Sequence, residues 1–143
     1  MFRRLGVMLV AAAFGLGLAM PAFAADKEKK IVLQISDGGD DKQSLVLNVA
    51  NNLQNHYGVD NVKLEIVAFG PGLRLLFKGN ENKGRIDSLS KSGVQFSACG
   101  NTATNMAKVL GRPVQLNSQA VMVKAGISRI LELTEQGYTL VRP

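Results

Sequence analysis

The strongest fold signal in the sequence is the segment Ile31-Val32-Leu33-Gln34-Ile35, which is followed by the turn residues Ser36-Asp37-Gly38-Gly39. A nearly continuous apolar run that ends at such residues is typical of a strand buried on both faces of a sheet. A strand of this kind needs other elements packed on both sides. The segment therefore predicts a central sheet that is covered on two faces.

The residues after this strand predict a βαβ unit. In residues 41–57 the apolar side chains recur at steps of three and four, which is typical of an amphipathic helix, and Gly58 ends the pattern. Residues 62–69 then predict a second strand, which ends at Gly70-Pro71-Gly72. Because a helix connects the two strands, we expect them to lie parallel.

The rest of the chain continues the alternation of strand and helix. Residues 114–123 are compatible with either a strand or an extended loop. The other expected elements are a short helical turn at 73–78, a helix at 85–91, a strand at 94–98, a helix at 101–110, a helix at 127–136 and a strand at 138–141. The pattern predicts the α/β class: a single-domain three-layer sandwich with a mostly parallel sheet of four or five strands.

The first 24 residues have the features of a cleavable signal peptide. Arg3 and Arg4 supply the positive start, residues 5–20 the apolar run, and Ala22-Phe23-Ala24 the small-x-small cleavage site. The apolar run is shorter than the roughly 20 residues of a membrane span. We therefore expect a signal peptide at 1–24, a mature domain at 25–143 with no membrane segment, and a periplasmic or secreted location. An uncleaved anchor is the less favoured alternative.

The charge pattern argues against a nucleic-acid partner. The chain has 17 Lys and Arg against 11 Asp and Glu, and the signal peptide removes two of the cations. The remaining basic residues are scattered, the chain contains no Trp, and aromatic residues make up 6% of it. No basic stripe with interleaved aromatic residues is present, so nothing suggests binding to DNA or RNA.

Cys99 is the only cysteine, so an internal disulfide is excluded. It falls where a predicted strand meets a predicted helix, and the free N–H groups of a helix start favour a thiolate. One interpretation makes Cys99 a nucleophile or sulfur carrier. The other makes it a small buried apolar residue, as free cysteines often are. From position alone, neither interpretation is preferred.

Three turns follow the three strands and are expected at one edge of the sheet, where ligands of parallel sheets bind. They contain Asp37 after the first strand, Gly70 and Gly72 after the second, and Cys99 with Asn101 and Thr102 after the third. Arg74 lies just beyond the glycine turn and is a candidate for facing an anion, although a solvated side chain is the commoner role.

A metal site at Asp37, Asp40 and Asp41 is the less favoured reading of that acidic cluster. The spacing does not fit a calcium loop, and Asp at a helix start is an ordinary cap. The single histidine, His56, offers no basis for a zinc site or a Ser-His-Asp triad. We expect no metal and no cofactor.

The sequence resembles the DsrE/DsrF-like family over nearly the whole mature chain. The residues that carry the resemblance are Ile31 to Asp37, Val67 to Leu73, Gly93 to Cys99 with Asn101-Thr102, and Gly126 to Gly137. The resemblance implies a small α/β domain, a trimeric or hexameric homo-oligomer, and a cysteine that passes sulfur on as a persulfide to or from a partner protein. It makes Cys99 the sulfur acceptor. Asn101 and Thr102 would then contact the sulfur or cap the helix, and Gly70 and Gly72 would wall the pocket.

Three function classes follow from these observations. The first is a periplasmic sulfur-handling protein that carries sulfane sulfur on Cys99. The alternative is a non-catalytic oligomeric module that binds a small ligand and keeps Cys99 as a structural residue. A hydrolase or redox enzyme ranks last, because the sequence lacks a partner base, a second cysteine and a cofactor motif.

Overall fold

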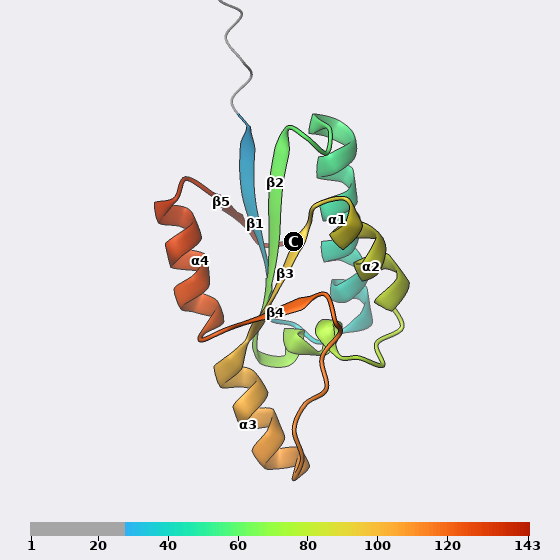
Figure 1. Cartoon of the computed structure of the whole chain (residues 1–143), viewed down its shortest axis with the longest axis vertical. Coiled ribbons are helices and arrows are strands. Elements are labelled where there is room, and N and C mark those ends of the chain that lie inside the picture. Colours follow the sequence, from blue (N-terminus) through green and yellow to red (C-terminus); the bar gives the residue numbers. More distant parts are fainter. Residues whose placement is uncertain (1–27) are drawn as a thin grey trace, which may run out of the picture.

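Five strands form one all-parallel sheet in the computed structural model, which describes residues 28–143 (Figure 1). The strands are β1 (Lys29–Ile35), β2 (Val62–Ala68), β3 (Gln95–Cys99), β4 (Ala120–Val123) and β5 (Thr139–Val141). Their order across the sheet is β4-β3-β2-β1-β5, and every neighbouring pair is parallel. The protein therefore has the α/β fold that the alternating pattern predicts.

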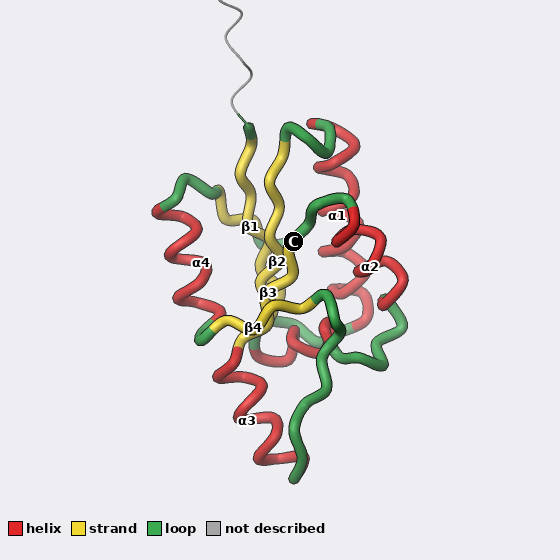
Figure 2. Tube along the Cα trace, in the orientation of Figure 1, coloured by secondary structure: helices red, strands yellow, loops and turns green. Residues whose placement is uncertain are grey.

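Helices cover both faces of this sheet, which gives three layers (Figures 1 and 2). The helices are α1 (Asp40–Tyr57), the 3₁₀ helix η1 (Gly70–Leu76), α2 (Lys83–Lys91), α3 (Gly100–Leu110) and α4 (Gly126–Glu135). The α1 and α2 helices lie on one face and α4 on the other. The α3 helix instead leads away from the sheet where β3 ends, and none of its residues is buried.

The hydrophobic core has a large part and a small part, one on each face of the sheet. On the large side, Leu33 and Ile66 are fully buried against α1, η1 and α2. On the small side, Val32 and Val67 pack against Ile130 and other residues of α4. Neighbouring residues of one strand thus enter different cores, which explains the apolar runs 31–35 of β1 and 64–68 of β2, each interrupted by one polar residue.

The structure settles or corrects several details of the sequence prediction. The region 114–123 divides into an extended segment and the short strand β4, and the extended segment is joined to Phe77 by an antiparallel bridge at Leu116. The helical turn expected at 73–78 begins earlier, at Gly70. The α1 helix has Gly39 as its N-cap, without a side-chain cap. The expected Asp cap was therefore wrong: Asp37 Oδ1 instead accepts a hydrogen bond from the N–H of Gly39 at 2.8 Å.

Two glycines allow the turn after β2 to pack closely on the turn after β1. A Cβ on Gly72 would lie 2.3 Å from the carbonyl oxygen of Ile35, a contact with rigid backbone that forbids any side chain there. Gly70 has a φ of +53°, in the left-handed region that favours glycine. These glycines are what let the ends of β1 and β2 meet.

The predicted signal peptide, with its cleavage site and the export it implies, lies outside the described residues. Within residues 28–143, no helix has the length and apolar character that a membrane crossing needs.

Candidate functional site

Cys99 is the last residue of β3 and directly precedes α3. Since all strands are parallel, the turns after β1, β2 and β3 meet at one edge of the sheet, as predicted. Backbone hydrogen bonds join them: the N–H of Phe69 donates to Ile35 O at 3.1 Å, and the N–H of Asn101 donates to Lys124 O at 3.2 Å. The turn after β4 therefore joins the same cluster.

Four hydrogen-bond donors act on the thiol of Cys99 and lower its pKa. They are the hydroxyl of Thr102 and the backbone N–H groups of Asn101, Thr102 and Gly126. The Thr102 hydroxyl also accepts a hydrogen bond from the N–H of Gly70 at 2.9 Å. Because Gly70 occupies an acceptor position of that oxygen, the hydroxyl hydrogen is free to point at the sulfur.

Two helix N-termini converge on Cys99. Asn101 and Thr102 belong to the first turn of α3, whereas Gly126 is the first residue of α4. The unpaired N–H groups of a helix start, together with the helix dipole, stabilise negative charge. The site is therefore suited to an anionic sulfur atom, and its donors come from segments about 25 residues apart in the chain.

These contacts lower the pKa of the Cys99 thiol. Burial is the largest single influence and raises the pKa, because it removes water from the thiolate. The hydrogen bonds from Thr102, Gly126 and Asn101 act in the opposite direction and together outweigh burial, so the pKa lies below its ordinary value. A buried thiol with a lowered pKa is the combination expected of a reactive cysteine rather than of an inert one.

The lowered pKa predicts how alkylation of native Cys99 depends on pH. The rate should reach half its maximum at a lower pH in the folded than in the unfolded protein, because the thiolate is the reacting form and its pKa is lowered by folding. Thr102→Val removes the hydroxyl donor and should move this midpoint to higher pH, whereas Thr102→Ser should leave it in place. Equal midpoints in all three proteins, measured with iodoacetamide, would show that the hydroxyl does not act on the sulfur.

The lowered pKa of Cys99 also makes the stability of the folded protein depend on pH. Because the pKa of Cys99 is lower in the folded than in the unfolded protein, the thiolate stabilises the fold at high pH. This contribution is fully present above the unfolded pKa of about 8.5. It is lost as the pH falls through the folded pKa.

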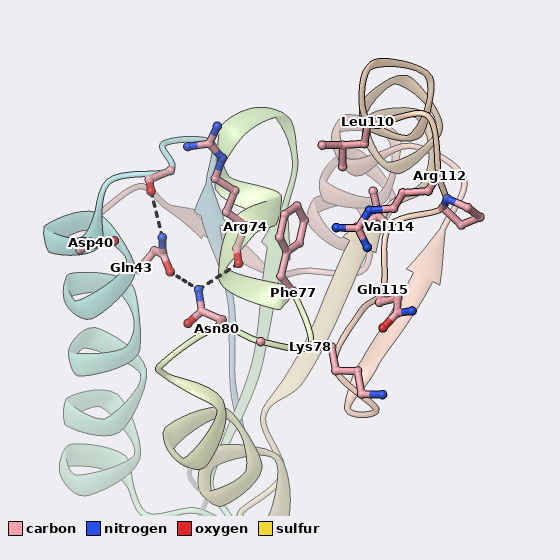
Figure 3. Close-up of a pocket in the computed structure, with 13 residues that line it drawn as sticks. Asp40, Gln43, Arg74, Phe77, Lys78, Asn80, Leu110, Arg112, Val114 and Gln115 are labelled. Carbon is pink, nitrogen blue, oxygen red and sulfur yellow. Dashed lines mark hydrogen bonds between the residues drawn. The ribbon is translucent and has the colours of Figure 1, made fainter.

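Of the remaining predicted site residues, Gly70 and Gly72 lie in the turns beside Cys99, whereas Asp37 and Arg74 line separate cavities. Gly70 contacts Thr102, as described above, and Gly72 packs on the backbone of Ile35. Asp37 lines a separate cavity with Lys42 and Arg142. Arg74 lines a further cavity, shown in Figure 3, and Cys99 is not among the residues that line that one. Within residues 28–143, no group of three or more His, Cys, Asp or Glu side chains is placed to hold a metal ion.

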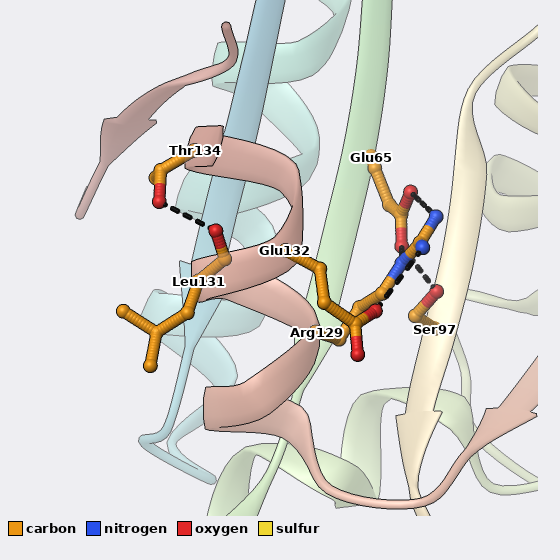
Figure 4. A network of polar contacts seen from close by, with 6 residues as sticks. All are labelled: Glu65, Ser97, Arg129, Leu131, Glu132 and Thr134. Atoms are coloured by element: carbon orange, nitrogen blue, oxygen red, sulfur yellow. Dashed lines mark hydrogen bonds and ion pairs between the residues drawn. The ribbon is translucent and has the colours of Figure 1, made fainter. Parts of the chain in front are cut away.

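The sequence analysis missed a buried ionic network beside the site (Figure 4). Glu65 of β2 is only 3% exposed and accepts two hydrogen bonds from Arg129 of α4, each 2.8 Å long. Ser97 of β3 donates a third to Glu65, at 2.6 Å. Ser97 and Cys99 lie on the same face of β3, so this network holds α4 on the sheet next to the cysteine. A carboxylate within the apolar run 64–68 of β2 was the signal available in the sequence.

The role of Gly126 was also missed. Its N–H reaches Cys99 because β4 lies beside β3 and because α4 begins just beyond the end of β4. A Cβ on Gly126 would lie 3.0 Å from Phe69, so a small residue is favoured at this helix start. No local sequence pattern links position 126 to position 99.

Comparisons with known proteins support the fold. No family model and no curated protein matches the chain. Among solved structures, it is similar to MTH1491, a protein of unknown function from Methanobacterium thermoautotrophicum, with a TM-score of 0.72 and 25% sequence identity. The alignment covers 80% of this chain and 99% of that chain. The two proteins share one single-domain α/β architecture, and the resemblance to the DsrE/DsrF-like family stays a prediction.

Proposed function

We propose that this protein is a sulfur carrier that holds sulfane sulfur as a persulfide on Cys99. The observation that carries the proposal is the position of Cys99 at the N-cap of α3, where donors from the starts of α3 and α4 lower the pKa of its thiol. A group of N–H and O–H donors with no partner base suits an anionic sulfur that waits for transfer. The predicted signal peptide extends the proposal to a periplasmic location and to a donor or acceptor protein there.

The chemistry needs no oxidant beyond the donor itself. The Cys99 thiolate attacks a sulfur atom of an inorganic polysulfide, a new S–S bond forms, and the donor's S–S bond breaks. The shortened polysulfide leaves with the electron pair of that bond, and the terminal sulfur on the protein keeps a negative charge. The donors that stabilise the thiolate are the nearest groups that can stabilise the persulfide anion.

A second candidate is a non-catalytic module that binds a small ligand and keeps Cys99 as a structural residue. The observation in its favour is that Cys99 is only 5% exposed. The two candidates differ in whether the native thiol reacts. The carrier predicts that polysulfide adds sulfur to the folded protein, whereas the binding module predicts reaction only after unfolding. The mass of the folded protein before and after incubation with polysulfide separates them.

We further propose that the domain forms a homo-oligomer, a trimer or hexamer as the resemblance implies, through α3 and the edge strand β4. No residue of α3 is buried, and Val109 on it is 87% exposed. On β4, Val121 and Met122 are each more than half exposed. Apolar side chains gathered on a projecting helix and a sheet edge are suited to contact with further copies of the chain.

The oligomer can be tested by the mass of the mature protein in sedimentation equilibrium. We expect a multiple of the protomer mass, and we expect Val109→Glu to shift the population toward the monomer because it places a charge in the contact. Val59→Glu is the control, since Val59 is likewise an exposed valine but lies in the turn between α1 and β2. A monomeric native protein would contradict the proposal.

A further inference from the structure

A cavity of about 790 Å³ is not lined by Cys99, and the proposed function does not use it (Figure 3). Its volume is in the range typical of small-molecule sites. Three parts of the chain form it: the start of α1, the end of η1 with the following loop, and the segment between α3 and β4. The lining residues that matter most are Gln43, Arg74, Phe77, Lys78, Asn80 and Arg112.

The charged groups of the cavity are mainly positive. Arg74, Lys78 and Arg112 line it together with a single carboxylate, that of Asp40. The ion pairs found among residues 28–143 involve other cations, so these three charges are not neutralised by carboxylates of the described chain. Clustered cations in a concave surface attract anions more strongly than the same charges spread over a flat one.

The floor of the cavity is held by a network of side-chain amides. Gln43 is 3% exposed, and its Nε2 donates to Gly38 O at 2.9 Å. Its Oε1 accepts from Asn80 Nδ2 at 2.7 Å, and the same Nδ2 donates to Arg74 O at 2.9 Å. The network ties the start of α1 to the backbone of Arg74, so this part of the cavity is formed before any ligand arrives.

Backbone hydrogen bonds also join the segment between α3 and β4, the opposite wall of the cavity, to the end of η1 and the loop after it. The N–H of Lys78 donates to Gln115 O at 2.9 Å, and the N–H of Asn117 donates to Leu76 O at 2.8 Å. These bonds hold the segment that carries Arg112 against the end of η1. Figure 3 shows the ring of Phe77 between Arg74 and Arg112, with Arg112 projecting toward the ring.

We propose that this cavity binds a small organic anion that carries a phosphate-type oxyanion group. Guanidinium groups recognise such oxyanions through paired N–H donors, which assigns Arg112, whose guanidinium projects toward Phe77, to the anionic group and places Arg74 and Lys78 at the rim. Phe77, with Leu110, Pro113 and Val114, supplies apolar surface for the organic part. The site is independent of the sulfur chemistry, because Cys99 does not line it.

The probe for this site is phenyl phosphate, followed by backbone amide shifts in an NMR titration of the mature protein. We expect shifts concentrated in residues 38–43, 74–80 and 110–115. Arg112→Gln should weaken binding at least tenfold, and Arg74→Gln should weaken it by a smaller factor. Lys91→Gln removes an exposed cation at the end of α2, away from the cavity, and should leave the affinity unchanged.

Further arms of the experiment test each part of the assignment. Phenyl phosphate should bind more tightly than inorganic phosphate if the apolar wall contributes, and Cys99→Ser should bind it as the native protein does. The proposal is overturned if phenyl phosphate shifts no amide of the three segments, if Lys91→Gln weakens binding as much as Arg112→Gln does, or if both phosphates bind equally. None of these results would bear on sulfur loading at Cys99.

Discussion

Arg129→Leu is expected to lower the free energy of unfolding by about 3–5 kcal/mol, the usual loss when one partner of a buried ion pair is removed. Glu65 is only 3% exposed and lies in the central strand β2. Without the guanidinium it keeps only the hydrogen bond from Ser97, and its negative charge stays buried. Urea unfolding followed by circular dichroism measures the change.

Two further variants isolate the buried pair as the cause. Glu132→Gln removes the second, exposed carboxylate near Arg129, which lies 3.6 Å away, and should cost less than about 1 kcal/mol. Glu65→Leu combined with Arg129→Leu removes both charges and should recover most of the stability that the single change loses. A loss for Arg129→Leu no larger than that for Glu132→Gln would show that the pair does not hold α4 on the sheet.

The strands that could be predicted from the sequence are those that are buried on both faces of the sheet. Residues of β1 and β2 enter a core on either face, so their apolar runs are nearly continuous and mark them clearly. The strand β4 has four residues at the edge of the sheet, and Val121 and Met122 in its middle are exposed. Its strand conformation depends on pairing with β3, so no local pattern distinguishes it from a loop.

The candidate site also has parts that could be predicted from the sequence and parts that could not. The placement of Cys99 at a strand end and helix start was predictable, because β3 is apolar up to the cysteine and the following residues favour a helix. The contact with Gly126 depends on the order of β3 and β4 in the sheet. The partner of Glu65 is likewise 64 residues away in the chain, so the sequence marks the carboxylate as unusual without naming Arg129.

Cys99→Ser is expected to abolish sulfur loading completely, the largest effect in this account. A serine keeps the size and the polar contacts of the side chain, so the donors from Thr102 and Gly126 retain a partner and the fold should persist. A hydroxyl cannot form a persulfide under the same conditions, because it is not appreciably ionised and has no sulfur to couple. Since Cys99 is the only cysteine, no other thiol can substitute for it.

The measurement that tests the central claim most directly is the intact mass of the folded mature protein, before and after incubation with inorganic polysulfide. The sulfur-carrier account predicts that the mass rises by whole sulfur atoms, that a reductant reverses the rise, and that folded Cys99→Ser shows none. An unchanged mass of the native protein, with loading only after unfolding, would contradict the account and make Cys99 a structural residue.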